Sequence, residues 1–344
     1  ARLDPRVVVV DKARQELSVA GQNNRYNNLT IDNVPANDEF GLNPSGLPAR
    51  NQVISIETIE EFQINISPYD VAQSNFNGAS INAVTKSGTN EFSGSVYYLF
   101  RDDSLIGENE NGQDFPTFEE DVYGFTVGGP IIKDKLFFFV GYEGFDRTEP
   151  GPGVGLLGSN ASTIFELDQS EIERIANIAQ SQYGLDVGTF EDPSDLADED
   201  ENIIVKFDWN VNDSNRLQLT YTENTGEEVI IPDRNVSEFS LGSYWYTSAI
   251  ERAATNLIWY SDWTPNLTTE VNFSTSSYLS TPITRSRAPQ TLVMTEAGDV
   301  LFGTERFRHA NRLDTDVTTF YAAGEYIWGD HNIKFGFDYK ETDI

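Results

Sequence analysis

Two strands joined by a tight turn are predicted by residues 201–224, ENIIVKFDWNVNDSNRLQLTYTEN. Within residues 203–211, apolar side chains occupy every second position and polar side chains occupy most of the positions between them. The same alternation runs through residues 216–222, after the turn at 212–215. Successive side chains of a strand point to opposite faces of its sheet. The pattern therefore predicts a hairpin with one apolar and one polar face.

The alternation continues on both sides of this hairpin and predicts nine strands after residue 89. They are expected at about 90–101, 121–128, 135–146, 202–211, 216–225, 251–263, 269–280, 315–328 and 332–342. Short connections alternate with long ones, which are expected at about 102–120, 147–201, 226–250 and 281–314. In an up-and-down meander, alternate connections lie at the same end of the sheet. Outer-membrane β-barrels show this separation into short turns and long outer loops.

The alternation alone does not decide whether the apolar face is a soluble core or a surface in contact with lipid. Aromatic residues near the expected strand ends favour lipid, because Trp and Tyr gather at membrane interfaces. These residues are Tyr98, Phe100, Tyr123, Tyr142, Trp209, Tyr221, Trp259, Trp263, Trp328 and Tyr339. For any single one of them, ordinary core packing is the alternative. The chain is therefore predicted to be mostly β, with an antiparallel up-and-down transmembrane β-barrel portion.

Composition limits the classes of function. The chain of 344 residues has 23 basic and 55 acidic residues, a net charge of 23 − 55 = −32. This negative field argues against nucleic acid as a partner, which needs cationic side chains to neutralise its phosphates. The chain has no Cys, and its two His residues, His309 and His331, are isolated. We therefore expect no enzyme activity, no metal site and no cofactor.

Residues 1–89 differ from the rest and predict a compact α/β unit in front of the meander. Val7–Val10 is expected to be a buried strand, and further strands are expected near 61–66 and at Ile81–Thr85. A good helix signal lies instead in the connection 147–201. There Ser170 followed by Glu173 forms a capping-box pattern, and Gly184 is expected to end the helix.

Several segments resemble TonB-dependent outer-membrane receptors. Residues 80–95, SINAVTKSGTNEFSGS, resemble the junction between the plug and the barrel of this family. Residues 56–62, IETIEEF, with 75–78, resemble the plug segment before it. Thr30–Val34 resembles a plug strand and turn, with Asn33 where Gly is usual. Residues 124–139, GFTVGGPIIKDKLFFF, resemble the first barrel hairpin of the Oar-like branch.

The resemblance implies an outer-membrane protein of a Gram-negative bacterium, with a 22-stranded barrel and a plug in its lumen. Residues 1–89 would be the C-terminal part of the plug domain and 90–344 the N-terminal part of the barrel. Because nine strands are predicted, and no TonB box precedes Val7, we expect an internal fragment whose sheet is incomplete and open.

The function implied by the resemblance is that of a receptor and transporter. It would bind a scarce substrate outside the cell and import it into the periplasm with energy from the TonB–ExbB–ExbD complex. The barrel would contact outer-membrane lipid. The substrate stays open among small molecules, oligosaccharides and peptides. The alternative function is that of a soluble, secreted acidic β-protein, an adhesin or a carbohydrate-binding module.

Candidate substrate-binding residues lie in the expected outer loop of the plug. They are Asn37, Asp38, Phe40 and Asn43, and a purely structural loop is the alternative.

The junction between plug and barrel gives a second set of candidates, Lys86, Ser87 and Gly88. They are predicted to turn the chain from the plug into the barrel, with Gly88 allowing an unusual dihedral. The acidic residues in 191–201 could offer oxygen ligands to Ca²⁺, but they lack the spacing of an EF-hand loop. We therefore expect a solvated loop there.

Overall fold

The structure is a computed structural model. It describes residues 7–11, 16–19, 23, 26–38, 48–49, 52–66, 79–107, 117–308 and 311–344.

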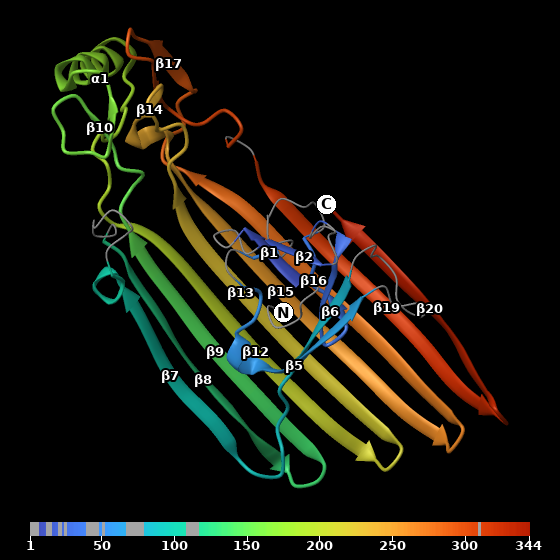
Figure 1. Cartoon of the computed structure of the whole chain (residues 1–344). Helices are drawn as coiled ribbons and strands as arrows, with labels where there is room; N and C mark the ends of the chain where they lie inside the picture. The colour runs from blue at the N-terminus through green and yellow to red at the C-terminus, as the bar shows by residue number, and fades with distance from the viewer. Residues whose placement is uncertain are drawn as a thin grey trace.

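One antiparallel sheet of nine strands forms most of the molecule, and each strand pairs with the next long strand along the chain (Figure 1). We call this sheet the wall. All nine predicted strands are confirmed, and short turns alternate with long connections as predicted. The strands are β7 (Ser93–Asp102), β8 (Glu119–Ile132), β9 (Leu136–Glu149), β12 (Leu196–Asn212), β13 (Asn215–Ile230), β15 (Tyr246–Thr264), β16 (Leu267–Thr284), β19 (Leu313–Trp328) and β20 (His331–Asp343).

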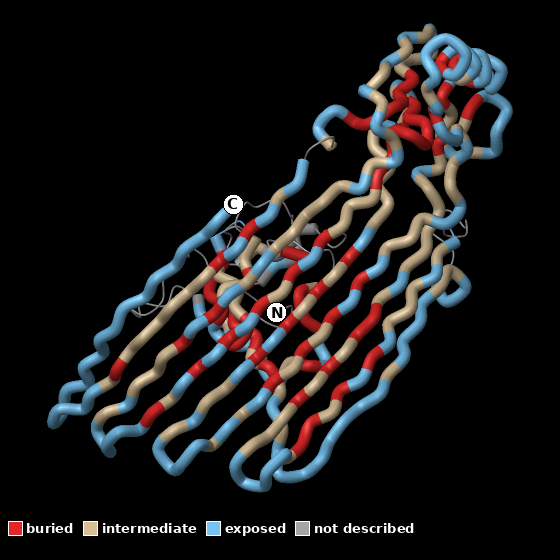
Figure 2. Tube along the Cα trace, turned by 180° about the vertical axis from the view of Figure 1, so that it is seen from behind, coloured by how far each residue is buried: buried red, intermediate tan, exposed pale blue. Residues whose placement is uncertain are grey.

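The two faces of the wall differ as the alternation predicts. Its outward face carries exposed apolar side chains: Val96 is 87% exposed, Phe337 58% and Trp259 42%. Figure 2, seen from behind, shows buried and exposed residues alternating along the middle strands. In the described part of the chain no second sheet covers this face, so the two-layer packing of a soluble β-protein is not observed. No helix in the described residues is long and apolar enough to cross a membrane.

The N-terminal residues lie against the other face, the lumen face (Figure 1). Their main sheet has the order β4-β3-β6-β5. We call the described residues 26–85 the plug. Its strands are β3 (Asn28–Ile31), β4 (Val34–Pro35), β5 (Ile59–Ile66) and β6 (Ala79–Thr85), and a 3₁₀ turn, η2 (Ile56–Thr58), precedes β5. The predicted strands near 61–66 and 81–85 are confirmed.

Two expectations for the N-terminal residues are corrected. Val7–Val10 does form a strand, β1 (Val7–Asp11), which pairs with β2 (Glu16–Val19), but Val8 is 58% exposed. The expected full burial is therefore wrong at Val8. In the described residues before 89 the helical content is Tyr26 and the 3₁₀ turn η2, so the unit is mainly β there.

The long connections fold together at one end of the wall. We call residues 150–195, 231–245 and 285–308 the cap (top left in Figure 1). Its elements are β10 (Val154–Leu156), β11 (Thr163–Phe165), α1 (Gln169–Tyr183), β14 (Glu238–Ser240), η4 (Gly242–Tyr244), β17 (Thr291–Met294) and β18 (Asp299–Phe302). Residues of all three connections share one apolar core, which includes Phe165, Ile172, Phe239 and Val300. Residues 191–195, which were expected to belong to a solvated loop, are therefore part of a folded unit.

The cap helix differs in detail from its prediction. Asp168, not Ser170, occupies the N-cap position, and its side chain makes no capping hydrogen bond. The capping-box expectation is wrong because the helix begins at Gln169, which places Ser170 inside its first turn. Gly184 ends the helix as predicted, with φ 66° in the left-handed region that glycine adopts without steric cost.

Candidate functional site

The plug contacts the wall through a tight hairpin at its tip. Asp32 and Asn33 connect β3 to β4 with φ values of 47° and 66°. Two successive residues with positive φ are typical of a type I′ hairpin turn, which Asn and Asp tolerate. Asn33 can therefore replace the Gly of the related motif. The turn places the Asp32 carboxylate at the wall.

A buried polar cluster surrounds Asp32. Its carboxylate accepts hydrogen bonds from the backbone N–H and the hydroxyl of Thr85, at 2.9 and 2.6 Å. Lys206 of β12 brings its ammonium within 3.5 Å of the same carboxylate, and it also donates to the Thr85 carbonyl and hydroxyl. Lys206 and Asp32 are 2% and 5% exposed, so this ion pair joins plug and wall away from bulk water.

A second polar cluster centres on Glu143 of β9, which is 3% exposed. Its carboxylate accepts hydrogen bonds from the plug hydroxyl of Ser55 and from the wall hydroxyl of Tyr97, each at 2.7 Å. The amide of Gln52 also donates to it. Hydrogen bonds to a carboxylate are among the stronger ones in proteins, so Glu143 fixes the plug segment before β5 to the wall.

Between these clusters the apolar contact is modest. One cluster of buried residues contains six plug residues and, from the wall, Phe139 and Ile204. The plug residues are Ile31, Ala36, Ala49, Val53, Ile54 and Ala83. The side chains are mostly small, so the plug rests on the wall through polar anchors and a small apolar patch.

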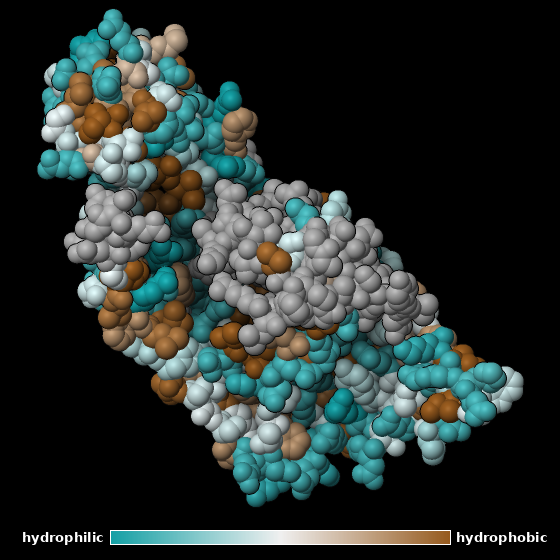
Figure 3. All heavy atoms as spheres, in the orientation of Figure 1, coloured by the Kyte–Doolittle hydropathy of each residue, from teal (hydrophilic) through white to brown (hydrophobic). Residues whose placement is uncertain are grey.

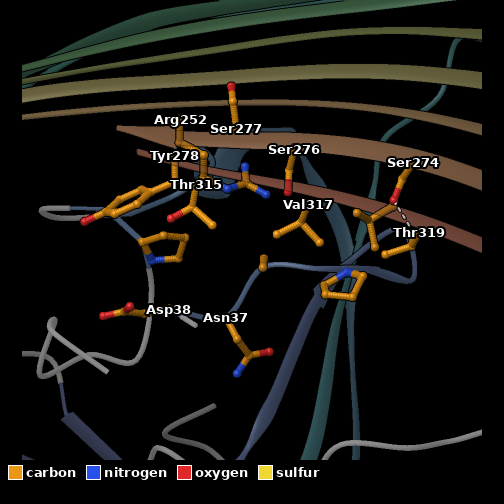
Figure 4. A pocket seen from close by; sticks show the side chains of 14 residues that line it. Asn37, Asp38, Arg252, Ser274, Ser276, Ser277, Tyr278, Thr315, Val317 and Thr319 are labelled. Atoms are coloured by element: carbon orange, nitrogen blue, oxygen red, sulfur yellow. Dashed lines mark hydrogen bonds between the residues drawn. The ribbon is translucent and has the colours of Figure 1, made fainter. Parts of the chain in front are cut away.

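A small recess lies where the plug tip meets β15, β16 and β19 (Figure 4). Its volume is about 30 Å³, and Asn37 and Asp38 line it together with Arg252, Thr315 and other wall residues. The Asn37 amide also accepts from the Leu29 N–H at 2.9 Å and donates to the Asn27 carbonyl at 2.7 Å. Asn37 thus holds the hairpin together while facing the recess.

A larger chamber adjoins the recess. It has a volume of about 610 Å³ and shares Pro35, Asn37, Asp38 and Thr319 with the recess lining. Its other walls are rich in amides, among them Asn28, Asn82 and Asn272. A volume of this size is within the range of small-molecule sites. Two of the predicted substrate-binding residues, Asn37 and Asp38, are therefore brought together at a cavity. Phe40 and Asn43 lie outside the described residues.

The junction residues connect the plug to β7. The Lys86 N–H donates to the Thr58 carbonyl at 2.8 Å, and the Lys86 ammonium donates to the Glu57 carbonyl at 2.7 Å. Ser87 is exposed. Gly88 does not have a positive φ, so the expected unusual dihedral is wrong. A Cβ at this position would lie 2.2 Å from the Phe138 carbonyl oxygen, so glycine is needed for close approach to the wall.

The acidic segment 191–201 does not converge on one point. Asp192 faces Arg234 of the cap at 3.2 Å, while residues 198–201 lie in β12 and alternate between its two faces. Among the described residues no group of three or more His, Asp or Glu side chains is placed to hold a metal ion.

Sequence reasoning missed Glu143, Lys206 and Arg252. Each lies on the polar face of a strand. The alternation predicts that face, but it does not indicate which of its residues contacts the plug.

Comparisons with known proteins agree with this architecture. Residues 84–164 match a family model described as an outer membrane beta barrel domain. The chain is 34% identical over 135 residues to the TonB-dependent transporter Oar of Myxococcus xanthus, a match that covers 37% of this chain and 12% of that protein.

Solved structures match over nearly the whole chain. The siderophore receptor PirA of Acinetobacter baumannii has a TM-score of 0.58 at 14% identity, over 95% of this chain and 41% of that one. A ferric enterobactin receptor of Pseudomonas aeruginosa, PfeA, has a TM-score of 0.57 at 12% identity, over 95% and 42%.

The chain thus spans less than half of the length of these relatives. The comparisons confirm the resemblance to TonB-dependent receptors, the barrel-wall fold and the outer-membrane location of a Gram-negative protein. The named relatives are transporters and receptors.

Proposed function

We propose that this outer-membrane protein binds a solute between its plug, its wall and its cap, and that it passes the solute to the periplasm when the plug moves. Energy would come from the TonB–ExbB–ExbD complex, as the relationship to a TonB-dependent transporter suggests. In this proposal residues 1–89 are the C-terminal part of the plug domain and residues 90–344 are barrel. Asn37 and Asp38 contact the solute, and Phe40 and Asn43 belong to the same loop.

The observation that supports this proposal most is the nature of the contact between plug and wall. Asp32, Lys206 and Glu143 make polar contacts, and the shared apolar cluster has two members from the wall. When the plug moves away from the wall, water can enter and take the place of the hydrogen bonds that these groups lose, so the separated groups stay solvated. The plug can therefore leave the wall without exposing a large apolar surface.

A disulfide between plug and wall tests whether this movement is needed. A Cβ at Gly141 of β9 would lie 3.7 Å from the Cβ of Thr58, which is close to the mean separation of the two Cβ atoms in disulfides. These 344 residues contain no Cys, so Thr58→Cys with Gly141→Cys places one cysteine pair within them. Cells that make the oxidised double variant should stop importing the solute, and a reductant should restore import.

Import can be followed before the substrate is known. Solutes lost from the medium are measured for cells with and without the protein, each in the presence and absence of TonB. The single variants Thr58→Cys and Gly141→Cys are the controls and should import in both redox states. Equal import by the oxidised double variant and its reduced form would refute plug movement, and import without TonB would refute the energy coupling.

A further inference from the structure

Arg252 of β15 is buried without a matching charge. The residue is 4% exposed and lies on the lumen face, where it lines the recess at the plug tip. Within the described residues its guanidinium makes one hydrogen bond, to the Thr222 hydroxyl, at 3.5 Å. No carboxylate of the described residues lies within ion-pair distance of it. A guanidinium has five N–H donors, so most of its hydrogen-bonding capacity is unused.

The surroundings of Arg252 add a second unused polar atom. The hydroxyl oxygen of Thr315, in a residue 2% exposed, has no hydrogen-bond partner in the described part of the chain, and it faces the same recess. Figure 4 shows Arg252 reaching from the wall into the space that faces Asn37 and Asp38. Buried polar groups without partners are rare in proteins and call for an explanation such as a missing ligand.

The cations of the wall lie on one face, which they share with carboxylates such as Glu143, Asp208 and Glu270. Every Lys and Arg inside the nine strands lies on the lumen face, according to the strand registers: Arg101, Arg147, Lys206, Arg216, Arg252, Lys334 and Lys340. Figure 3, which shows the lumen side, has hydrophilic residues over much of the wall, with hydrophobic patches among them. Among these cations, Arg101, Arg147 and Lys206 already have carboxylate partners, which are Glu120, Glu149 and Asp32.

We propose that the recess binds an anionic group, a carboxylate or a phosphate, of the solute, through the guanidinium of Arg252 and the hydroxyl of Thr315. Arginine matches both groups because its planar fork can donate two parallel hydrogen bonds. The recess, at about 30 Å³, holds one small substituent, and the adjoining chamber of about 610 Å³ holds the body of the solute. This inference rests on the proposed function only in assigning the anion to the imported solute.

The proposal is tested with the complete protein purified in detergent at pH 7. Its melting temperature is measured against rising concentrations of inorganic phosphate, acetate or the neutral propionamide, at constant ionic strength. Phosphate or acetate should raise the melting temperature in a saturable way, and propionamide should not. The anion with the lower midpoint identifies the preferred group. No saturable response to either anion would overturn the proposal.

Substitutions assign the response to the recess. Arg252→Gln keeps the length and polarity of the side chain but removes the charge, and it should raise the midpoint for the anion at least tenfold. Arg216→Gln is the matched control: Arg216 also faces the lumen, but it stacks on Tyr260 and lines a different cavity. It should keep the natural midpoint. Equal losses in both variants would overturn the assignment to Arg252.

A structural role for Arg252 predicts a different result without any anion. Removing a buried charge that lacks a partner should leave the melting temperature unchanged or raise it. A clear fall in Arg252→Gln without anion would mean that the guanidinium stabilises the fold, and it would overturn the proposal. Neither measurement needs transport, so a failed import assay would contradict the proposed function and leave the anion site standing.

Discussion

The ion pair between Asp32 and Lys206 shows what a single buried contact does for the plug. Asp32→Asn keeps the left-handed turn, since Asn tolerates positive φ, but it leaves the Lys206 ammonium buried without a counter-charge. The expected loss in unfolding free energy is about 3 kcal/mol. Denaturant unfolding in detergent measures it.

A double variant shows how much of the stability loss in Asp32→Asn comes from the unpaired charge of Lys206. Asp32→Asn combined with Lys206→Met removes both charges and should recover at least half of the stability lost in Asp32→Asn. If the double variant is less stable than Asp32→Asn by the full cost of Lys206→Met, the two side chains do not interact.

The candidate site was partly predictable at the level of residues. The family resemblance predicts Asn37 and Asp38 in the outer loop of the plug, and the structure puts both at a cavity. Arg252 and Glu143 were not predictable as site residues, because the alternation treats all polar positions of a strand alike. Only the registers between distant strands reveal that these two side chains meet the plug or the recess.

A charged side chain on the outward face of a strand should lower the unfolding free energy. Phe207→Arg would place a cation on the apolar face of β12, where the expected cost is about 2–4 kcal/mol near the bilayer centre. Gln218→Arg is the control on the lumen face. Gln218 donates to the Asp208 carboxylate at 2.8 Å, so an arginine there gains a partner and should cost less than about 1 kcal/mol. Urea unfolding in lipid vesicles compares the two, and equal losses would contradict the assignment of faces.

The cap should be sensitive to alkali. Tyr244 is 2% exposed, and its hydroxyl donates to Asp233 at 3.0 Å. Burial, followed by this hydrogen bond and the charge of Asp233, raises its pKa above the usual 10.0. The folded cap therefore holds this proton to higher pH than the unfolded chain. The contribution to stability is complete below about pH 10 and falls as the pH rises further.

Limited proteolysis at pH 8 and pH 11 measures this effect. The natural cap should be cleaved faster at pH 11, and Tyr244→Phe should reduce the ratio of the two rates. Tyr183→Phe, at an exposed position of α1, is the control and should leave the ratio unchanged. An unchanged ratio in Tyr244→Phe would exclude Tyr244 as the sensitive group.

The strands were predictable from the sequence, but the positions of their ends on the cap side were not. β12 begins at Leu196, whereas the alternation predicts about residue 202. Asp198, Glu199 and Asp200 have low strand propensity, yet they pair on both sides with β9 and β13. The cap was not predictable either, because its core joins connections that are far apart in the sequence. The helix signal at Ser170–Gly184 was the sign of structure that the sequence gives in these connections.

Across the whole molecule, charge marks the two ends of the wall. The outward acidic residues all lie toward the cap and away from the tight turns; they are Asp102, Glu119, Asp121, Asp146, Glu199, Glu201, Glu223, Glu227, Glu251, Asp314, Asp316, Glu341 and Asp343. Tyrosine hydroxyls donate to several of these carboxylates, as in the pairs Tyr142–Glu201 and Tyr339–Glu341. This band marks the limit of hydrocarbon contact on the cap side.

The orientation of the wall follows from these ends and can be measured. Ser181→Cys on α1 and Ser214→Cys in a tight turn are exposed positions in a chain that has no other Cys. In intact cells, an impermeant maleimide should label Ser181→Cys, and it should label Ser214→Cys only after the outer membrane is made permeable. The reverse pattern would mean that the cap faces the periplasm.

The shared core of the cap has a consequence for recognition by antibodies. Its surface is assembled from three separate stretches of chain, so an antibody against the native cell would bind a discontinuous epitope. Sera raised against synthetic peptides from any one stretch should bind the denatured protein on a blot and leave living bacteria unstained.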